Sequence, residues 1–208
     1  GGLAIPPAPN TNEPPTGGAL DTERPQPPAT DTNERGQGPR AALLIGSTLL
    51  GLTLYGAGVP TAFDLWDSDD GGRLAVGTYL LLAASSFFVP YLLTTETPPT
   101  WGQAAAALHG AYNGAWHGLF FYYVLAGGWE NGEEMMGASV LTSLVEGIGG
   151  YALAGYTDMT AGEAHAMQTG TMLGAGLLAG TTLAIGGEEG DVDVFMWMAV
   201  LGILGGGV

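Results

Sequence analysis

A chain of 208 residues has room for one domain or one small helical bundle. Its net charge of −16, with four arginines as its whole basic complement, excludes the basic surface that a nucleic-acid-binding protein needs. Charged residues make up only 12% of the chain, about half the usual ~25% of a soluble domain, and the lack of cysteine excludes disulfides, thiolate metal sites and cysteine nucleophiles.

Residues 1–39 are predicted to form a disordered, proline-rich tail. They hold nine of the thirteen prolines, interspersed with Thr, Asn, Asp and Glu. Proline fixes φ and lacks a backbone donor, and such a polar composition cannot bury a core. The tail has two interpretations: a solvated spacer, which we favour, and a segment that binds a partner.

Six apolar segments follow and make up residues 40–208. Five of them reach the ~20 residues that a helix needs to cross the ~30 Å hydrocarbon core of a bilayer. The sixth ends at Val208 and is expected to be truncated, and we expect residues to be missing at both ends of the chain. Pro60 is expected to end the first helix, and Pro90 to kink the second. The predicted helices span about 41–59, 74–93, 100–126, 135–156, 160–187 and 192–208.

This succession predicts an all-α fold, a multi-pass transmembrane bundle of five to six helices. A single segment of this kind would also suit the buried core of a soluble protein, but the loops between the segments are too short to hold a separate fold. We expect the chain in a membrane, the cytoplasmic membrane of a prokaryote. Aromatic residues near the segment ends suit the two membrane surfaces: Trp101, Trp129, Tyr122, Tyr123 and Tyr156.

Two predicted helix starts repeat with an offset of 60 residues. Thr100 is followed by Gln103, and Thr160 by Glu163, each with the capping-box spacing that satisfies free amides at a helix start. The same offset aligns two glycine pairs, Gly110 and Gly114 with Gly170 and Gly174. We interpret the chain as tandem helical hairpins that join the first helix to the second, the third to the fourth and the fifth to the sixth.

The hairpin arrangement places three acidic loops on one side of the membrane. They lie at 64–70, 130–134 and 188–193 and carry eleven acidic residues. We favour simple solvation of these loops, and the alternative is that they bind Ca²⁺ or another hard cation. Arg35 and Arg40 precede the first helix on the opposite side, so the positive-inside rule places that side in the cytoplasm.

The third segment carries polar residues in a regular stripe. His109, Asn113 and His117 are spaced four apart, and residues four apart lie on one face of a helix. Glu146 is the one ionisable residue deep within the fourth segment, and antiparallel packing would place it between the levels of His109 and His117. His165, near the start of the fifth helix, is expected at the membrane surface.

Three interpretations of this polar intramembrane cluster stay open. The one we favour is a set of hydrogen bonds between helices that fixes the bundle. The second is a path for protons or cations. The third is a His/Glu metal site, which the spacing disfavours because His109 and His117 would lie about 12 Å apart along the helix axis. We therefore assign no metal site, cofactor or catalytic residue.

Glycines spaced four apart form stripes on which another helix can pack closely. Lipid provides no hydrophobic drive between helices, so close van der Waals contact over small residues holds them together. The predicted packing residues are Gly110, Gly114, Gly118, Gly170, Gly174, Gly176 and Gly180.

These patterns favour a non-enzymatic integral membrane protein with a structural or accessory role. Its expected partners are the lipid bilayer and other membrane helices, including those of a second copy. The alternative function is a small transporter, or an ion or proton channel, with a polar path through the third and fourth helices. A membrane enzyme is the third hypothesis, and nothing in the sequence names a substrate.

Overall fold

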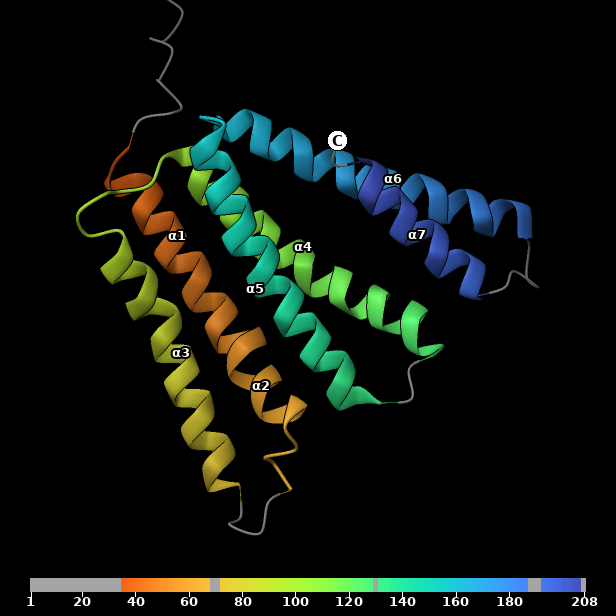
Figure 1. Ribbon diagram of the computed structural model, residues 1–208, viewed down its shortest axis with the longest axis horizontal. Coiled ribbons are helices and arrows are strands. Elements are labelled where there is room, and N and C mark those ends of the chain that lie inside the picture. The colour runs from red at the N-terminus through yellow and green to blue at the C-terminus, as the bar shows by residue number, and fades with distance from the viewer. Residues whose placement is uncertain (1–34, 68–71, 129–130, 187–191, 207–208) are drawn as a thin grey trace, which may run out of the picture. The chain divides into compact units, whose positions relative to one another are not determined.

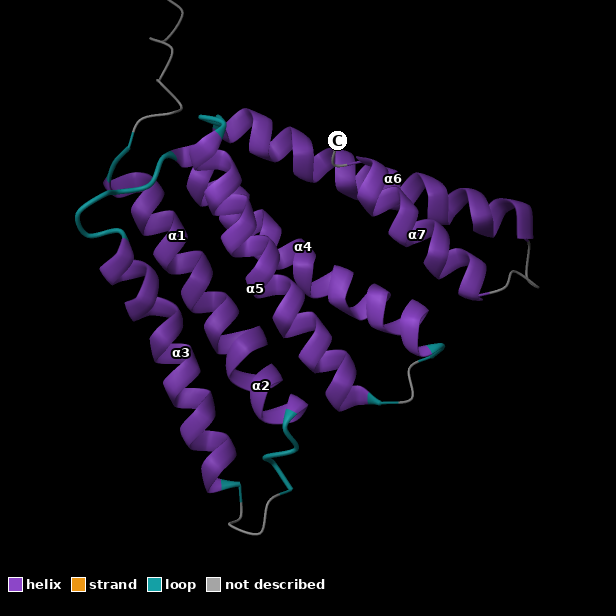
Figure 2. Ribbon diagram, viewed as in Figure 1, coloured by secondary structure: helices purple, strands orange, loops and turns teal. Residues whose placement is uncertain are grey.

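The computed structural model describes residues 35–67, 72–128, 131–186 and 192–206, which all belong to one unit, Asp31–Val208. Helices are the only regular secondary structure in these ranges (Figure 2), beside one isolated antiparallel bridge between Arg35 and Thr100. The prediction of an all-α fold is confirmed for this part of the chain. The helices are α1 (Gln37–Leu50), η1 (Gly51–Tyr55), α2 (Gly56–Ala62), α3 (Arg73–Leu93), α4 (Trp101–Ala126), α5 (Gly132–Tyr156), α6 (Ala161–Gly186) and α7 (Val192–Gly206).

Helices that follow one another in the chain pack side by side as hairpins (Figure 1). α3 runs back along the rod made by α1, η1 and α2, α5 runs back along α4, and α7 runs back along α6. α4 also contacts α1, α6 and α7, and α2 contacts α5. The α4–α5 hairpin therefore joins the other two, and it carries most of the residues that the sequence singled out.

α1, η1 and α2 form one continuous helix with a wider turn in its middle. At that turn the Gly56 amide bonds to the Gly51 carbonyl, five residues back, which is the spacing of a π-helix. The prediction that Pro60 ends this helix is wrong, because α2 continues to Ala62. Pro60 lies in the last turn of the helix, so the amide that it lacks removes one backbone hydrogen bond close to the helix end.

Two of the described helices are long and apolar enough to cross a membrane, judged by length and composition. They are the continuous helix Gln37–Ala62 and α3. The helix α4 is as long, with 26 residues, but glycine, asparagine and histidine dilute its apolar character. The expectation that five segments reach this standard is thus met by two in the part of the chain that can be described.

The starts of α4, α5 and α6 are capped by side chains. Thr100 and Gln103 exchange hydrogen bonds of 3.1 Å in a full capping box at the start of α4. Thr160 and Glu163 make the same reciprocal contacts before α6, so both predicted capping boxes are confirmed. Asn131 caps α5 by accepting hydrogen bonds from the two following glutamate amides.

The predicted tail lies almost wholly outside the described residues. Of residues 1–39, only 35–39 are described, and α1 already begins at Gln37. Pro39 lies in the first turn of α1, where a helix tolerates a residue without an amide. Arg35 and Gly36 pair with the loop that precedes α4, since the Gly36 amide donates to the Pro99 carbonyl at 3.3 Å.

Candidate functional site

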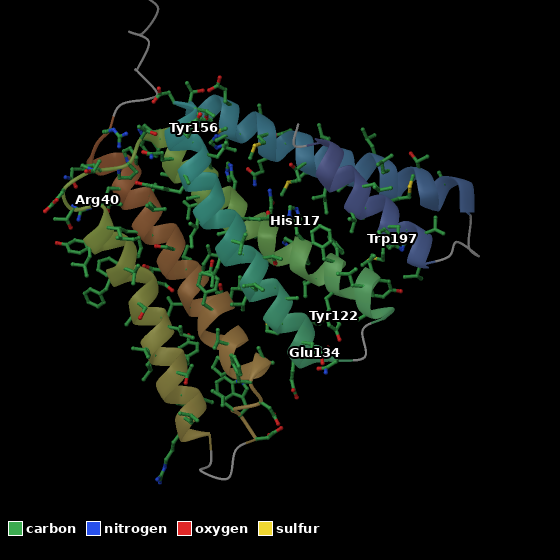
Figure 3. The ribbon with its side chains drawn as sticks, viewed as in Figure 1. Arg40, His117, Tyr122, Glu134, Tyr156 and Trp197 are labelled. Carbon is green, nitrogen blue, oxygen red and sulfur yellow. The ribbon has the colours of Figure 1, made fainter. Side chains whose placement is uncertain are left out.

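The polar stripe of α4 meets α5 at one hydrogen-bonded pair of side chains. The Nδ1 atom of His117 lies 2.7 Å from Oε1 of Glu146, and the two side chains are 10% and 32% exposed. Figure 3 shows His117 in the middle of its helix, far from both hairpin ends. Two of the four residues that the sequence grouped together are therefore in direct contact.

The direction of the side chains explains why Glu146 pairs with His117. A Cβ added at Gly110 would overlap the backbone of Glu146, so these two residues lie at one depth. His117 stands seven residues farther along α4, about 10 Å along the axis. Helical side chains lean toward the N-terminus of their own helix. Because α4 and α5 are antiparallel, His117 and Glu146 lean toward each other and close the gap.

His109 takes part in a different contact. Its ring lies edge-on to the ring of His165 on α6, with 4.7 Å between the centroids. The Nδ1 atom of His109 is buried and has no hydrogen-bond partner within the described ranges. His165 itself is exposed, and its Nδ1 atom lies 2.6 Å from the Ala161 carbonyl oxygen.

Asn113 lies on the same stripe, one turn before His117, and is 8% exposed. The four predicted residues thus do not converge on one point. They divide into the His117–Glu146 pair, the His109–His165 contact and a buried asparagine between them. In the described ranges, no three His, Asp or Glu side chains lie close enough together to hold a metal ion.

A row of hydroxyl groups on α5 connects three helices, α5, α4 and η1, at the centre of the unit. Ser143 donates to the Ala111 carbonyl of α4 at 2.6 Å, and its Oγ atom lies 2.9 Å from the hydroxyl of Tyr55 in η1. Ser139 donates to the Ala115 carbonyl at 2.7 Å. This row was not predicted from the sequence. Its spacing of three and four residues, from Ser139 to Thr142 and from Ser139 to Ser143, is nevertheless a detectable signal.

The glycine stripe of α4 lies directly on the backbone of α5. A Cβ at Gly114 would come within 2.5 Å of the Thr142 carbonyl oxygen, and one at Gly118 would overlap the Ala138 carbonyl. Thr142 in turn donates to the Gly114 carbonyl at 2.5 Å. No residue larger than glycine fits at these positions without moving α5.

The glycines of α6 are used unevenly. The Gly174 carbonyl lies directly against Gly202 of α7, so backbones meet there as they do between α4 and α5. Gly176 and Gly180 face open space, with no described atom within 4 Å of an added Cβ. The packing role predicted for these two has no counterpart in the described part of the chain.

Comparisons of the chain with protein-family models, with curated proteins and with solved structures gave no match. The residues themselves therefore carry the functional argument.

The acidic loops are described only in part. Asp64 and Asp67 after α2 are exposed, and Glu134 at the start of α5 accepts a hydrogen bond of 3.0 Å from Tyr122. The residues 68–70, 130 and 188–191 lie outside the described ranges. Solvation of these loops stays a prediction, with binding of a hard cation as its alternative.

The unit also has an apolar groove of about 680 Å³. It runs along α1, between α3 on one side and the α4–α5 hairpin on the other. Leu43 and Thr94 line one end, and Val59 and Val140 line the other. The polar stripe of α4 does not open into it, since none of His109, Asn113, His117 and Glu146 is part of its wall.

Proposed function

We propose that this chain is a multi-pass integral membrane protein whose glycine-packed hairpins serve as a structural or accessory component of a membrane assembly. The observation that carries the proposal is the exposure of α3. Ala75 and Ala83 are the only buried residues of α3, and Leu81 and Leu93 are 66% and 76% exposed. An apolar helix in the core of a soluble protein would be covered.

Burial energies make water an implausible surrounding for this helix. Apolar surface costs about 25 cal/mol per Å² when it faces water, and soluble monomers rarely expose apolar patches above a few hundred Å². The α1–η1–α2 helix, with 22% of its apolar window buried, adds a second surface of this kind. Lipid removes the cost on both helices at once.

The interior contacts suit helix association in lipid. Hydrocarbon side chains gain nothing by leaving lipid for a protein core, so close backbone contact and hydrogen bonds between helices hold such bundles together. The contact surface between α4 and α5, called the seam below, is built in this way. It consists of glycines on α4 and of hydroxyls on α5 that donate to α4 carbonyls. The polar side chains act as links between helices, which is the structural interpretation of the stripe.

The charges at the two ends of the hairpins support an orientation. Figure 3 shows Arg40 at one end of the unit and Glu134 at the other. The 21 residues of α3 between these ends would span about 31 Å, close to the ~30 Å of a hydrocarbon core. The positive-inside rule then assigns the Arg40 end to the cytoplasm of a prokaryotic cell.

The absence of cysteine allows a direct test. Single variants Asp67→Cys, after α2, and Glu96→Cys, after α3, place one thiol at each end of α3. A membrane-impermeant maleimide applied to intact cells should label the first and spare the second, and the pattern should reverse in inverted vesicles. Equal labelling of both thiols from one side, or release of the protein by alkaline carbonate, would refute the proposal.

A second candidate function is movement of protons or cations along α4 and α5. It is favoured by the His117–Glu146 pair, which places two ionisable side chains in contact at mid-depth of the hairpin. Proteoliposomes that contain the parent protein would then show a flux that Glu146→Gln reduces. If the parent protein shows no flux, the transport function is refuted and the structural role remains as the only candidate.

A further inference from the structure

The groove is elongated and extends about 24 Å along the α1–η1–α2 helix, from Leu43 to Val59, which is more than one lipid leaflet. Along α3 its wall extends from Thr94 back to Leu82, twelve residues or about 18 Å, against about 15 Å for half a hydrocarbon core. Its volume of about 680 Å³ lies in the range of pockets that enclose small molecules. An elongated ligand that enters from one membrane surface would fit this shape.

Most hydroxyl groups of the wall already have hydrogen-bond partners within the protein. Ser47, Ser86 and Ser143 all line the groove, yet each donates its hydroxyl to a helix carbonyl: those of Leu44, Leu82 and Ala111 at 3.2, 2.8 and 2.6 Å. Apart from Ser85, the surface that remains for a ligand is largely hydrocarbon. The occupant of the long part of the groove is therefore a hydrocarbon chain.

A fixed positive charge stands at the Thr94 end. Arg40 donates from Nε to the Thr94 hydroxyl at 3.2 Å and from Nη2 to the Tyr91 carbonyl and the Thr95 hydroxyl, both at 3.1 Å. Its guanidinium also lies 4.6 Å from the centre of the Tyr91 ring. These four contacts hold the guanidinium in place beside the groove wall.

No carboxylate neutralises this charge within the described ranges. Arg40 forms no ion pair there, not even with Glu96 two residues beyond Thr94, and its Nη1 atom makes no hydrogen bond. A planar guanidinium with free donors matches the oxygens of a phosphate. An apolar partner helix would leave the charge unmatched, whereas a lipid with an anionic head group would satisfy both ends of the site.

We propose that the groove binds one acyl chain of an anionic phospholipid whose phosphate pairs with Arg40. The proposal rests on the membrane location proposed above. The lipid fills the space between α3 and the α4–α5 hairpin, and thus joins two parts of the unit that are connected through the α1–η1–α2 helix.

The test uses the full chain, reconstituted in phosphatidylcholine with a minor share of phosphatidylglycerol and then extracted in mild detergent. Native mass spectrometry counts the lipids that stay bound. Phosphatidylglycerol should be enriched about fivefold over its share in the bilayer, the effect of one arginine near an anionic head group. Arg40→Gln should remove the enrichment and Arg40→Lys should keep most of it. Arg73→Gln, at the other end of α3, is the matched control and should leave it unchanged.

A second pair of variants tests the groove without touching the arginine. Val89 lines the groove, and Leu81 is exposed on α3 outside it. Val89→Trp should reduce the number of bound lipids, and Leu81→Trp should not. Equal lipid binding by these two variants, or an enrichment that survives Arg40→Gln, overturns the proposal. Recovery of the chain as a soluble protein without detergent would instead overturn the membrane location.

Discussion

Substitution of Gly114 by alanine should loosen the α4–α5 hairpin, although alanine is the better helix former. The added Cβ would lie 2.5 Å from the Thr142 carbonyl oxygen and 2.8 Å from Cα of Ser143. Ordinary contact needs about 1 Å more, so α5 must retreat. Overpacking of this kind costs about 1–3 kcal/mol.

The retreat also lengthens the hydrogen bonds that cross the seam. Those from Ser139, Thr142 and Ser143 to α4 carbonyls measure 2.7, 2.5 and 2.6 Å, and each contributes about 0.5–1.5 kcal/mol. Alanine returns about 1 kcal/mol through its higher helix propensity. The net loss of unfolding free energy for Gly114→Ala should be about 1–3 kcal/mol, the gain in propensity offsetting part of the overlap and hydrogen-bond losses.

Gly149 provides the matched control on the facing helix. Nothing lies within 4 Å of a Cβ added there. Gly149→Ala should therefore stabilise the protein by about 0.5–1 kcal/mol through propensity alone. Unfolding by sodium dodecyl sulfate in mixed micelles, followed by circular dichroism, measures both changes. Shifts of the same sign in the two variants would show that the close approach of α4 and α5 is not what Gly114 provides.

Three further substitutions test single contacts in the same unfolding assay. Glu146→Ala leaves its histidine partner unpaired and should cost about 1–3 kcal/mol, while Glu146→Gln, which keeps a hydrogen-bonding oxygen, should cost less; equal losses would deny the pair a role. Thr100→Ala removes half of a capping box and should lower the free energy of unfolding by about 1 kcal/mol. Its control is Thr169→Ala, whose hydroxyl bonds only within its own helix and whose loss should cause no measurable change. Tyr55→Phe should cost about 0.5–1.5 kcal/mol, and Tyr156→Phe, at 90% exposure, should cost nothing.

The helix positions follow from the sequence to within a few residues because polar loops interrupt the apolar segments. The two largest errors at helix starts are at α1, placed at 41 instead of Gln37, and at α5, placed at 135 instead of Gly132. Glu133 and Glu134 read as loop residues by polarity. At a helix start, however, carboxylates are favoured by the helix dipole and the free amides need a cap, which Asn131 supplies.

The candidate site was less accessible to sequence reasoning, for a geometric reason. Depth alone placed Glu146 between His109 and His117, and it could not choose between them. The choice depends on the lean of side chains along antiparallel helices, and this favours His117. Tyr55 gave no signal at all, because a single tyrosine in an apolar helix belongs to no periodic pattern.

The polar contacts resolve an ambiguity that the glycine stripe creates. Gly110, Gly114 and Gly118 repeat every four residues, so a slide of α5 by one turn would still place glycine against backbone over most of the seam. Glycine packing thus brings the helices together without fixing their register. The His117–Glu146 pair exists at one register only, since a one-turn slide of about 6 Å would separate the two side chains. We infer that the pair sets the register, a role for which buried polar groups in helical assemblies are best attested.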